Sequence, residues 1–276
     1  MLETEAITDK TIINCPGVIY IGGDRLPIQD FGARVHGRLN VVGAIKMSSN
    51  IFFCQASIEN SSIDEFIPYL RDFGIGQLTG IDVPGEAWGT FPSPEVKRNL
   101  AEVNSWVDPF WYPEGDMCLT SFGQGIVTAT PIQMTVVTAA IANGGKIYKP
   151  TLIDKLVHPD KEVEVIEAEI LRSNFISRGN LALVRQGMRE SASGDGIIRI
   201  LDDAVVPVAA KTGSAEYGTR DERGRYEHVH GWVTGFFPYD EPKYAVTILL
   251  EDGKGGTNAA KVLRDVVDYM YTDNDN

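Results

Sequence analysis

Two short polar clusters in this sequence combine residue types that carry out serine chemistry. One is the Lys-Thr-Gly-Ser run at 211–214, which leads out of an apolar segment; Lys-Thr-Gly of this kind belongs to serine acyl-transfer sites. The other is Ser-Ser-Asn at 48–50, directly before a second apolar run. A serine hydroxyl becomes a nucleophile only beside a base, so such sites place amines and hydroxyls close together. Each cluster alone is more typical of a turn or a helix cap, but the two together, in this order and with their flanks, predict one site.

The C-terminal third of the chain must position the Lys-Thr-Gly run on a sheet. Runs of β-branched and aromatic residues predict three strands, and the short turn PYDEP joins the last two into an antiparallel hairpin. A helix follows whose apolar residues recur at helical spacing, so one of its faces would lie on that sheet. The strands are expected at 205–211, 232–237 and 244–251, and the helix at 258–271. The Lys-Thr-Gly run therefore ends or edges a strand.

The middle of the chain is predicted to be helical around a shaped loop. Thr130 is placed as an N-cap and Pro131 as the first residue of a helix that stops at Gly144. The stretch before it, SFGQGIVTATP, is too rich in Gly and Thr for regular structure and is expected to shape the wall of a cleft. Further helices are expected at 62–73 and 180–190, and strands at 146–148 and 163–166.

Length and charge exclude several classes of protein. A chain of 276 residues with 43% hydrophobic content and no clean break in composition is interpreted as one domain. A formal net charge of -13 leaves no basic stripe to neutralise phosphates, which argues against nucleic-acid binding. No apolar run approaches the roughly 18 residues of a membrane helix, and the first residues lack the features of a signal peptide.

Three cysteines, Cys15, Cys54 and Cys118, stand at irregular spacing. An odd number at such spacing predicts neither a disulfide framework nor a CxxC zinc site. The sequence therefore leaves the redox compartment undetermined.

The flanks of the two polar clusters carry a family resemblance. In chain order they read HGRLNVVGAIKMSSNIFF, FGIGQLTGIDVPGE, SFGQGIVTATPIQM, AAKTGSAEYG and HGWVTGFFP. With these segments the chain resembles the transpeptidase domain of the class B penicillin-binding proteins. PSPEVKRN and FWYPEGDM are most similar to the elongation-type branch, penicillin-binding protein 2. The resemblance covers nearly the whole chain and implies an α/β (α+β) fold of the penicillin-binding protein and serine β-lactamase type, with a five-stranded, mainly antiparallel sheet flanked by helices.

The family builds its site from three motifs: Ser-x-x-Lys with the nucleophile, Ser-x-Asn, and Lys-Thr-Gly. Ser48 and Asn50 match the second motif, so the resemblance implies that Ser48 relays a proton to the leaving amine and that Asn50 orients a lysine and the substrate amide. Lys211 matches the third, and its positive charge would favour ionised partners. These three are the expected catalytic residues.

The rest of the third motif is expected to bind substrate. The hydroxyls of Thr212 and Ser214 suit the terminal carboxylate of a D-Ala-D-Ala peptide. Gly213 leaves room for a backbone approach that a side chain would obstruct. The backbone N–H of Ser214 would form one arm of an oxyanion hole, and the N–H of the nucleophile the other.

The first motif is not found in this chain. No serine is followed three residues later by a lysine; Ser93 with Lys97 misses by one position. By the resemblance, MLETEAITDKTIINCPG reads like the segment just after that motif, which puts Met1 inside the nucleophile helix. We therefore expect residues 1–276 to be one transpeptidase domain, incomplete at its N-terminus and inactive alone, as a fragment, a mis-called start or a split gene would be. Ser48 is not expected to replace the nucleophile.

The resemblance also implies a setting. The intact protein would cross-link peptidoglycan stem peptides through a serine acyl-enzyme, be acylated by β-lactams, and work with the cell-elongation machinery at the extracytoplasmic face of the bacterial plasma membrane; this chain shows neither anchor nor signal. Two alternatives remain open. One is a β-lactamase or β-lactam sensor of the same fold, and the other is a non-catalytic module that binds a cell-wall partner.

Cys15, Asp30 and His36, with Ser49 or Cys54 near them, are candidate ligands for a zinc site, because Cys, His and Asp all bind zinc and some elongation-type relatives carry a metal in this region. A buried cysteine and a hydrogen-bonded histidine account for the same residues and are the favoured interpretation. No cofactor is therefore predicted.

Overall fold

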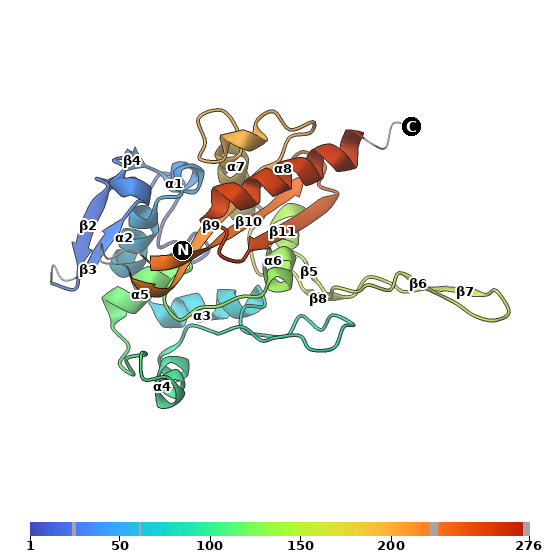
Figure 1. Cartoon of the computed structure of the whole chain (residues 1–276), viewed down its shortest axis with the longest axis horizontal. Helices are drawn as coiled ribbons and strands as arrows, with labels where there is room; N and C mark the ends of the chain where they lie inside the picture. The colour runs from blue at the N-terminus through green and yellow to red at the C-terminus, as the bar shows by residue number, and fades with distance from the viewer. Residues whose placement is uncertain (24–25, 61, 221–225, 273–276) are drawn as a thin grey trace.

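A three-stranded antiparallel sheet forms the centre of the C-terminal half, with strand order β11-β10-β9. The computed structural model describes residues 1–23, 26–60, 62–220 and 226–272. The helix α8 (Gly256–Thr272) crosses one face of the sheet, and α6 (Pro131–Asn143) packs against β10 and β11 (Figure 1). The strands are β9 (Ala209–Arg220), β10 (Tyr226–Phe237) and β11 (Tyr244–Leu250).

The two faces of this sheet have different partners because side chains alternate along each strand. Val233 and Phe237 of β10 are buried in one hydrophobic cluster with Leu263 of α8. Thr234 points to the other face, where its hydroxyl forms a hydrogen bond with that of Thr138 in α6. Helices thus cover both faces of the sheet, as the predicted fold class requires.

The first half of the chain is mainly helical and, together with α7 (Arg178–Ser191), forms a second buried cluster that also includes Phe236 of the central sheet. The helix α1 (Val41–Met47) packs on α7, and α2 (Asn50–Asn60) packs on α5 (Pro113–Ser121). Buried side chains from these elements, among them Ala44, Ile51, Phe52, Cys118 and Met188, form one cluster. The remaining helical elements are α3 (Ile63–Asp72), α4 (Pro94–Val103) and the short 3-10 helices η1 (Phe31–Ala33) and η2 (Arg199–Leu201).

Local sequence signals explain where several helices begin and end. The Thr130 hydroxyl accepts a hydrogen bond from Gln133 N, and the Gln133 side chain accepts one from Thr130 N, which caps α6. Gly144 ends that helix in the left-handed region. Ser62 and Glu65 cap α3 in the same reciprocal way. The helices predicted from the sequence in these regions are confirmed, as are those that became α7 and α8.

The other strands of the described residues pair two by two in antiparallel ladders. The hairpin of β6 and β7 projects from the body of the molecule, as Figure 1 shows. The pairs are β1 (Ile13–Cys15) with β4 (Gly37–Leu39), β2 (Val18–Ile21) with β3 (Leu26–Gln29), β5 (Ile147–Tyr148) with β8 (Ile170–Arg172), and β6 (Lys155–Val157) with β7 (Val163–Val165).

The central sheet differs from expectation in its extent. It has three strands among the described residues where the resemblance implies five, because the remaining strands pair with one another. β9 begins at Ala209 rather than at 205: Pro207 has no N–H for a ladder, and Val205 N donates to Asp268 instead. β9 also continues to Arg220, so the Lys-Thr-Gly run lies inside a strand, at the edge of the sheet.

One disulfide corrects the prediction drawn from the cysteine count. Cys54 of α2 and Cys118 of α5, 64 positions apart in the sequence, are bonded to each other, and Cys15 is a free, buried thiol. The odd total hid the pair, because only the packing of α2 on α5 makes these two cysteines neighbours. Across the described ranges, no helix is both long enough and apolar enough to cross a membrane.

Candidate active site

Residues 48–50, which we call motif two, form the turn between α1 and α2. Ser48 caps the C-terminus of α1 with φ 56° and ψ 47°, the left-handed region that non-glycine residues adopt only at a cost of about 1–3 kcal/mol. Its N–H bonds to Ile45 O at 3.2 Å and so closes the last turn of the helix. The backbone thus bends sharply at the serine that the sequence analysis singled out.

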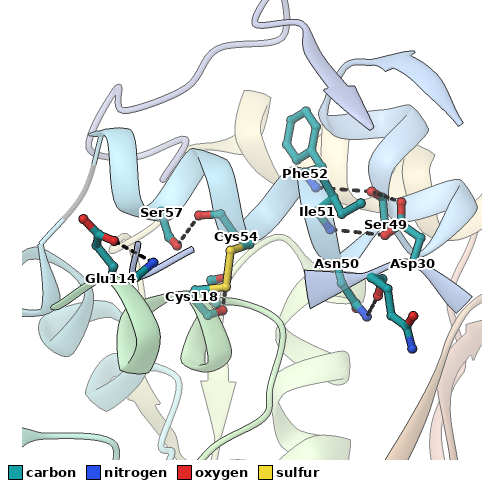
Figure 2. The surroundings of a disulfide bond; sticks show 12 residues. Asp30, Ser49, Asn50, Ile51, Phe52, Cys54, Ser57, Glu114 and Cys118 are labelled. Atoms are coloured by element: carbon teal, nitrogen blue, oxygen red, sulfur yellow. Dashed lines mark hydrogen bonds between the residues drawn. A yellow bond between two sulfur atoms is a disulfide. The ribbon is translucent and has the colours of Figure 1, made fainter. Parts of the chain in front are cut away.

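Ser49 and Asp30 form a buried polar pair beneath this turn (Figure 2). The Ser49 hydroxyl donates to Asp30 Oδ2 at 3.0 Å and accepts a hydrogen bond from Phe52 N at 3.2 Å. Asp30 Oδ1 accepts a hydrogen bond from Ile51 N at 3.2 Å. The carboxylate therefore satisfies the Ile51 N–H in the first turn of α2 directly, supports the Ser49 hydroxyl that satisfies Phe52 N–H, and places negative charge at the positive end of the helix. Asp30 was considered only as a metal ligand in the sequence; this positioning role was missed.

Asn50 is the first residue of α2. Its side-chain amide donates to Gln29 O of β3 at 2.9 Å, so one of its two N–H groups anchors motif two to the neighbouring hairpin. Its expected role toward the substrate stays a prediction.

Residues 211–214, which we call motif three, lie in β9. The register pairs Lys211 with Thr234 and Gly213 with Trp232, so Lys211 and Gly213 share the face of the sheet that α6 covers. Thr212 and Ser214 belong to the opposite face. A Cβ at Gly213 would lie 3.4 Å from Trp232 Cβ, the near limit of ordinary contact.

Lys211 joins the two motifs. Its Nζ donates to Ser48 Oγ at 2.6 Å and to Thr212 O at 2.7 Å, across 163 positions of sequence in the first case. Burial lowers the pKa of the Lys211 ammonium from 10.5 to about 8. An amine with that pKa is partly neutral near pH 7, so it can hand a proton to Ser48 or take one from it. The structure thus brings together Ser48, for which the resemblance implies a proton relay, and Lys211, which was expected to add positive charge; their catalytic roles stay predictions.

The other two side chains of motif three face the start of α8. Ser214 Oγ accepts a hydrogen bond from Gly256 N at 3.2 Å, and a Cβ added at Gly256 would lie 2.7 Å from Thr212 Cβ. The N-terminus of α8 therefore packs directly on the strand. The hydroxyl hydrogen of Ser214 is still available as a donor for a substrate carboxylate, and the expected substrate contacts of Thr212, Gly213 and Ser214 stay predictions.

The loop between α5 and α6 also reaches motif three. Gln124 Nε2 donates to Ser214 O at 3.1 Å. The sequence indicated this loop as a wall of the site but gave no signal that Gln124 would contact the strand, because the contact spans 90 positions.

The candidate zinc ligands lie near one another but are bonded as a protein network. His36 Nε2 lies 3.8 Å from Asp30 Oδ2, and the same oxygen accepts a hydrogen bond from the Ser49 hydroxyl. Burial raises the pKa of the Cys15 thiol. Cys54 is in the disulfide. In the described part of the chain no group of three or more His, Cys, Asp or Glu residues could hold a metal ion. These residues therefore do not fit a zinc site.

Comparison with known proteins defines the class of this fold and site. The family described as "Penicillin binding protein transpeptidase domain" matches residues 1–268. The chain therefore belongs to the penicillin-binding protein transpeptidase family, and the resemblance and fold class inferred from the sequence are confirmed.

Relatives within that family point to the penicillin-binding protein 2 branch. The chain is 32% identical to the peptidoglycan D,D-transpeptidase MrdA of Haemophilus influenzae over 289 residues, which cover 97% of this chain and 42% of that protein. It is similar to the structure of penicillin-binding protein 2 from Helicobacter pylori, with a TM-score of 0.81 and 30% identity over 98% of this chain and 46% of the other. The complex of that protein with MreC gives 0.79 and 29%, covering 98% and 47%. The chain spans about two fifths of the length of the curated relatives it matches.

Proposed function

We propose that this chain is the D,D-transpeptidase domain of an elongation-type penicillin-binding protein, which cross-links peptidoglycan stem peptides through a serine acyl-enzyme. The observation that carries the proposal is the 2.6 Å hydrogen bond from Lys211 Nζ to Ser48 Oγ, which joins two of the three family motifs. The similarity to proteins described as peptidoglycan D,D-transpeptidases supports it.

In this proposal the nucleophile is a serine outside these 276 residues, because Ser-x-x-Lys is not in the sequence. That serine attacks the peptide carbonyl of D-Ala-D-Ala, and the leaving D-alanine takes its proton from the Ser48 hydroxyl. Lys211 restores the proton to Ser48 and regains the one that the nucleophile's hydroxyl releases as the acyl bond forms, so that its positive charge faces the substrate carboxylate again at the end of the step. The Ser214 N–H stabilises the oxyanion. Without that serine, the 276 residues, which we take as one transpeptidase domain, are inactive alone.

The setting follows from the same proposal. The substrate is a D-Ala-D-Ala stem peptide, β-lactams acylate the same serine, and the partners belong to the cell-elongation machinery; the solved complex of the Helicobacter pylori protein with MreC supports that last point. The Cys54–Cys118 disulfide favours an oxidising compartment, in keeping with the extracytoplasmic face of the plasma membrane.

Covalent labelling by a fluorescent penicillin, resolved on a denaturing gel, tests the proposal. The 276-residue chain is compared with a version extended upstream through the neighbouring reading frame until it includes Ser-x-x-Lys. We expect only the extended chain to be labelled. Labelling of the 276-residue chain, lost on Ser48→Ala, would make Ser48 the nucleophile and overturn the inactivity proposed here. An extended chain that contains the motif, is folded and stays unlabelled would leave a non-catalytic binding module.

A further inference from the structure

The Cys54–Cys118 disulfide joins α2, the helix that begins with Asn50 of motif two, to α5 (Figure 2). Cys54 lies one helical turn after Asn50, at the start of α2, where motif two ends. Cys118 lies one turn before the end of α5, which opens the loop carrying Gln124. Both cysteines are fully buried. The bond therefore connects α2, whose first residue is the last residue of motif two, to α5, which precedes the loop that reaches motif three.

The loop depends on α5 for its position. Gln124 N bonds to Leu119 O at 2.9 Å and Gly123 N to Thr120 O at 3.1 Å, so the loop folds back on the last turn of the helix. Gly123 and Gly125 both have φ 81°, a conformation that glycine adopts without strain. Gln124 is thus held by the end of α5 on one side and by Ser214 on the other.

α5 itself is a weak anchor without a further constraint. It is nine residues long, contains Gly115, and packs chiefly on α2. Helices of this length are marginal on their own, so their position comes from tertiary contacts. Its other tethers lie toward its N-terminus: Asp116 pairs with Lys97, and Glu114 accepts a hydrogen bond from Gly22 N. Toward the loop, the disulfide is the covalent tether, and Leu119 and Phe122 pack against the hydrophobic core between it and Gln124.

We propose that the Cys54–Cys118 disulfide is a positioning element of the candidate site, which fixes the end of α5 against α2 so that Gln124 holds β9, and with it Lys211, beside Ser48. The route runs from motif two through α2, the disulfide, α5 and Gln124 to Ser214. β9 is the edge strand of its sheet: β10 pairs with it along one side, α7 and α8 pack on it, and this route reaches it at Ser214. The inference rests on the site assigned under the proposed function, but its test does not require acylation.

The test follows the accessibility of Lys211 in the 276-residue chain. Lysines are acetylated with N-hydroxysuccinimidyl acetate and the rate at each site is measured by peptide mass spectrometry, with Lys155 on the exposed β6–β7 hairpin as the internal reference. The variants are Cys54→Ala/Cys118→Ala, Gln124→Ala, and the triple combination. Gln186→Ala is the matched control, because it removes a glutamine hydrogen bond, to Glu190, on an exposed face of α7.

We expect Lys211 to be acetylated about fivefold faster relative to Lys155 in Gln124→Ala, the factor that loss of one net hydrogen bond gives. The double cysteine variant should match it, and the triple variant should be no faster than either, because the changes interrupt one route. Gln186→Ala should leave the ratio unchanged. If the disulfide only stabilises the fold, its removal should lower the urea midpoint of unfolding but leave the acetylation rate of Lys211 relative to Lys155 unchanged in the folded protein.

An unchanged Lys211 ratio in a folded double cysteine variant overturns the proposal. If that variant does not fold, Gln124→Ala decides alone, since an unchanged ratio there removes the route through the loop. A triple variant whose rate is the product of the two separate effects also contradicts a single route. Penicillin labelling is not part of this readout, so failure of the proposed function and failure of the positioning role are distinguished.

Discussion

Motif two and motif three lie against each other, but different interactions hold them in place. Motif two is held by a buried polar network: Asp30 accepts hydrogen bonds from the Ser49 hydroxyl and from Ile51 N. Motif three is held by close backbone packing, where Gly256 of α8 lies too near β9 for any side chain. Motif two thus depends on the Asp30 carboxylate and its hydrogen-bond partners, whereas motif three depends on the lack of a side chain at Gly256.

The difference separates two kinds of sensitivity. A polar network fails when one partner is removed, because the remaining buried groups lose their hydrogen bonds. A close-packed strand and helix fail when atoms are added, because the interior has no room. Lys211 belongs to both the polar network and the close-packed strand, because it lies in β9 and its amine forms a hydrogen bond with Ser48 in the turn after α1.

The largest effect should come from removing the amine that joins the two parts. In the extended chain, Lys211→Met should slow acylation by a fluorescent penicillin by about 10³-fold, the middle of the range for loss of a proton-transferring group. Lys46→Met is the matched control: Lys46 is on α1, two residues before Ser48, and pairs with Asp195 instead. If Lys211→Met is acylated at a rate close to that of Lys46→Met, Lys211 takes no part in the acylation step.

Stability should rise in alkali because of the same amine. The folded pKa of Lys211 is about 8 and its ordinary value is 10.5, so between these values the unfolded chain holds a proton that the folded chain has released. The free energy of unfolding should then increase between pH 8 and 10.5, by up to about 3 kcal/mol from this group. Urea unfolding of the wild type and Lys211→Met at several pH values isolates that contribution from the tyrosines. Parallel curves would contradict the lowered pKa.

Within the polar network, Asp30→Ala should lower the free energy of unfolding by about 3 kcal/mol, because it leaves the Ser49 hydroxyl and Ile51 N without a partner in the interior. Asp82 offers a close control: it accepts hydrogen bonds from the Thr151 hydroxyl and Leu152 N, but it is exposed. Asp82→Ala should cost much less in the same urea experiment. Equal losses would mean that burial does not set the importance of Asp30.

In the close-packed part, Gly256→Ala should cost about 2 kcal/mol, since the new Cβ would lie 2.8 Å from Gly213 O and from Trp232 O. At Gly179 in α7 a Cβ meets no other atom within 4 Å, so Gly179→Ala should be neutral or slightly stabilising. Thermal unfolding of both variants measures the contrast. A neutral Gly256→Ala would show that α8 moves away from the strand without loss.

Features encoded locally could be read from the sequence. The N-cap at Thr130 and the turn after Phe237 depend on neighbours a few residues apart, and the structure contains both. The placement of Ser48 and Lys211 in one site was reached by resemblance, because no local rule brings together residues so far apart in the sequence; the hydrogen bond between them came from the structure.

Features that depend on tertiary contact could not be read in this way. The Cys54–Cys118 bond requires α2 on α5, and the cysteine count gave no hint of it. Asp30 was interpreted as a candidate metal ligand, because the sequence around an aspartate does not show whether its carboxylate will cap a buried helix or bind zinc. The extent of β9 was misjudged because most residues from 213 to 219 are exposed and their strand structure comes from pairing with β10.

The central claim is that Lys211 and Ser48 act as one unit, and a double-mutant cycle in the extended chain tests it most directly. Acylation by a fluorescent penicillin is timed for the wild type, Lys211→Met, Ser48→Ala and the double variant. If the 2.6 Å hydrogen bond carries the proton, the double variant should be about as slow as the slower single variant. Effects that multiply in the double variant would contradict the account, because the two side chains would then act independently.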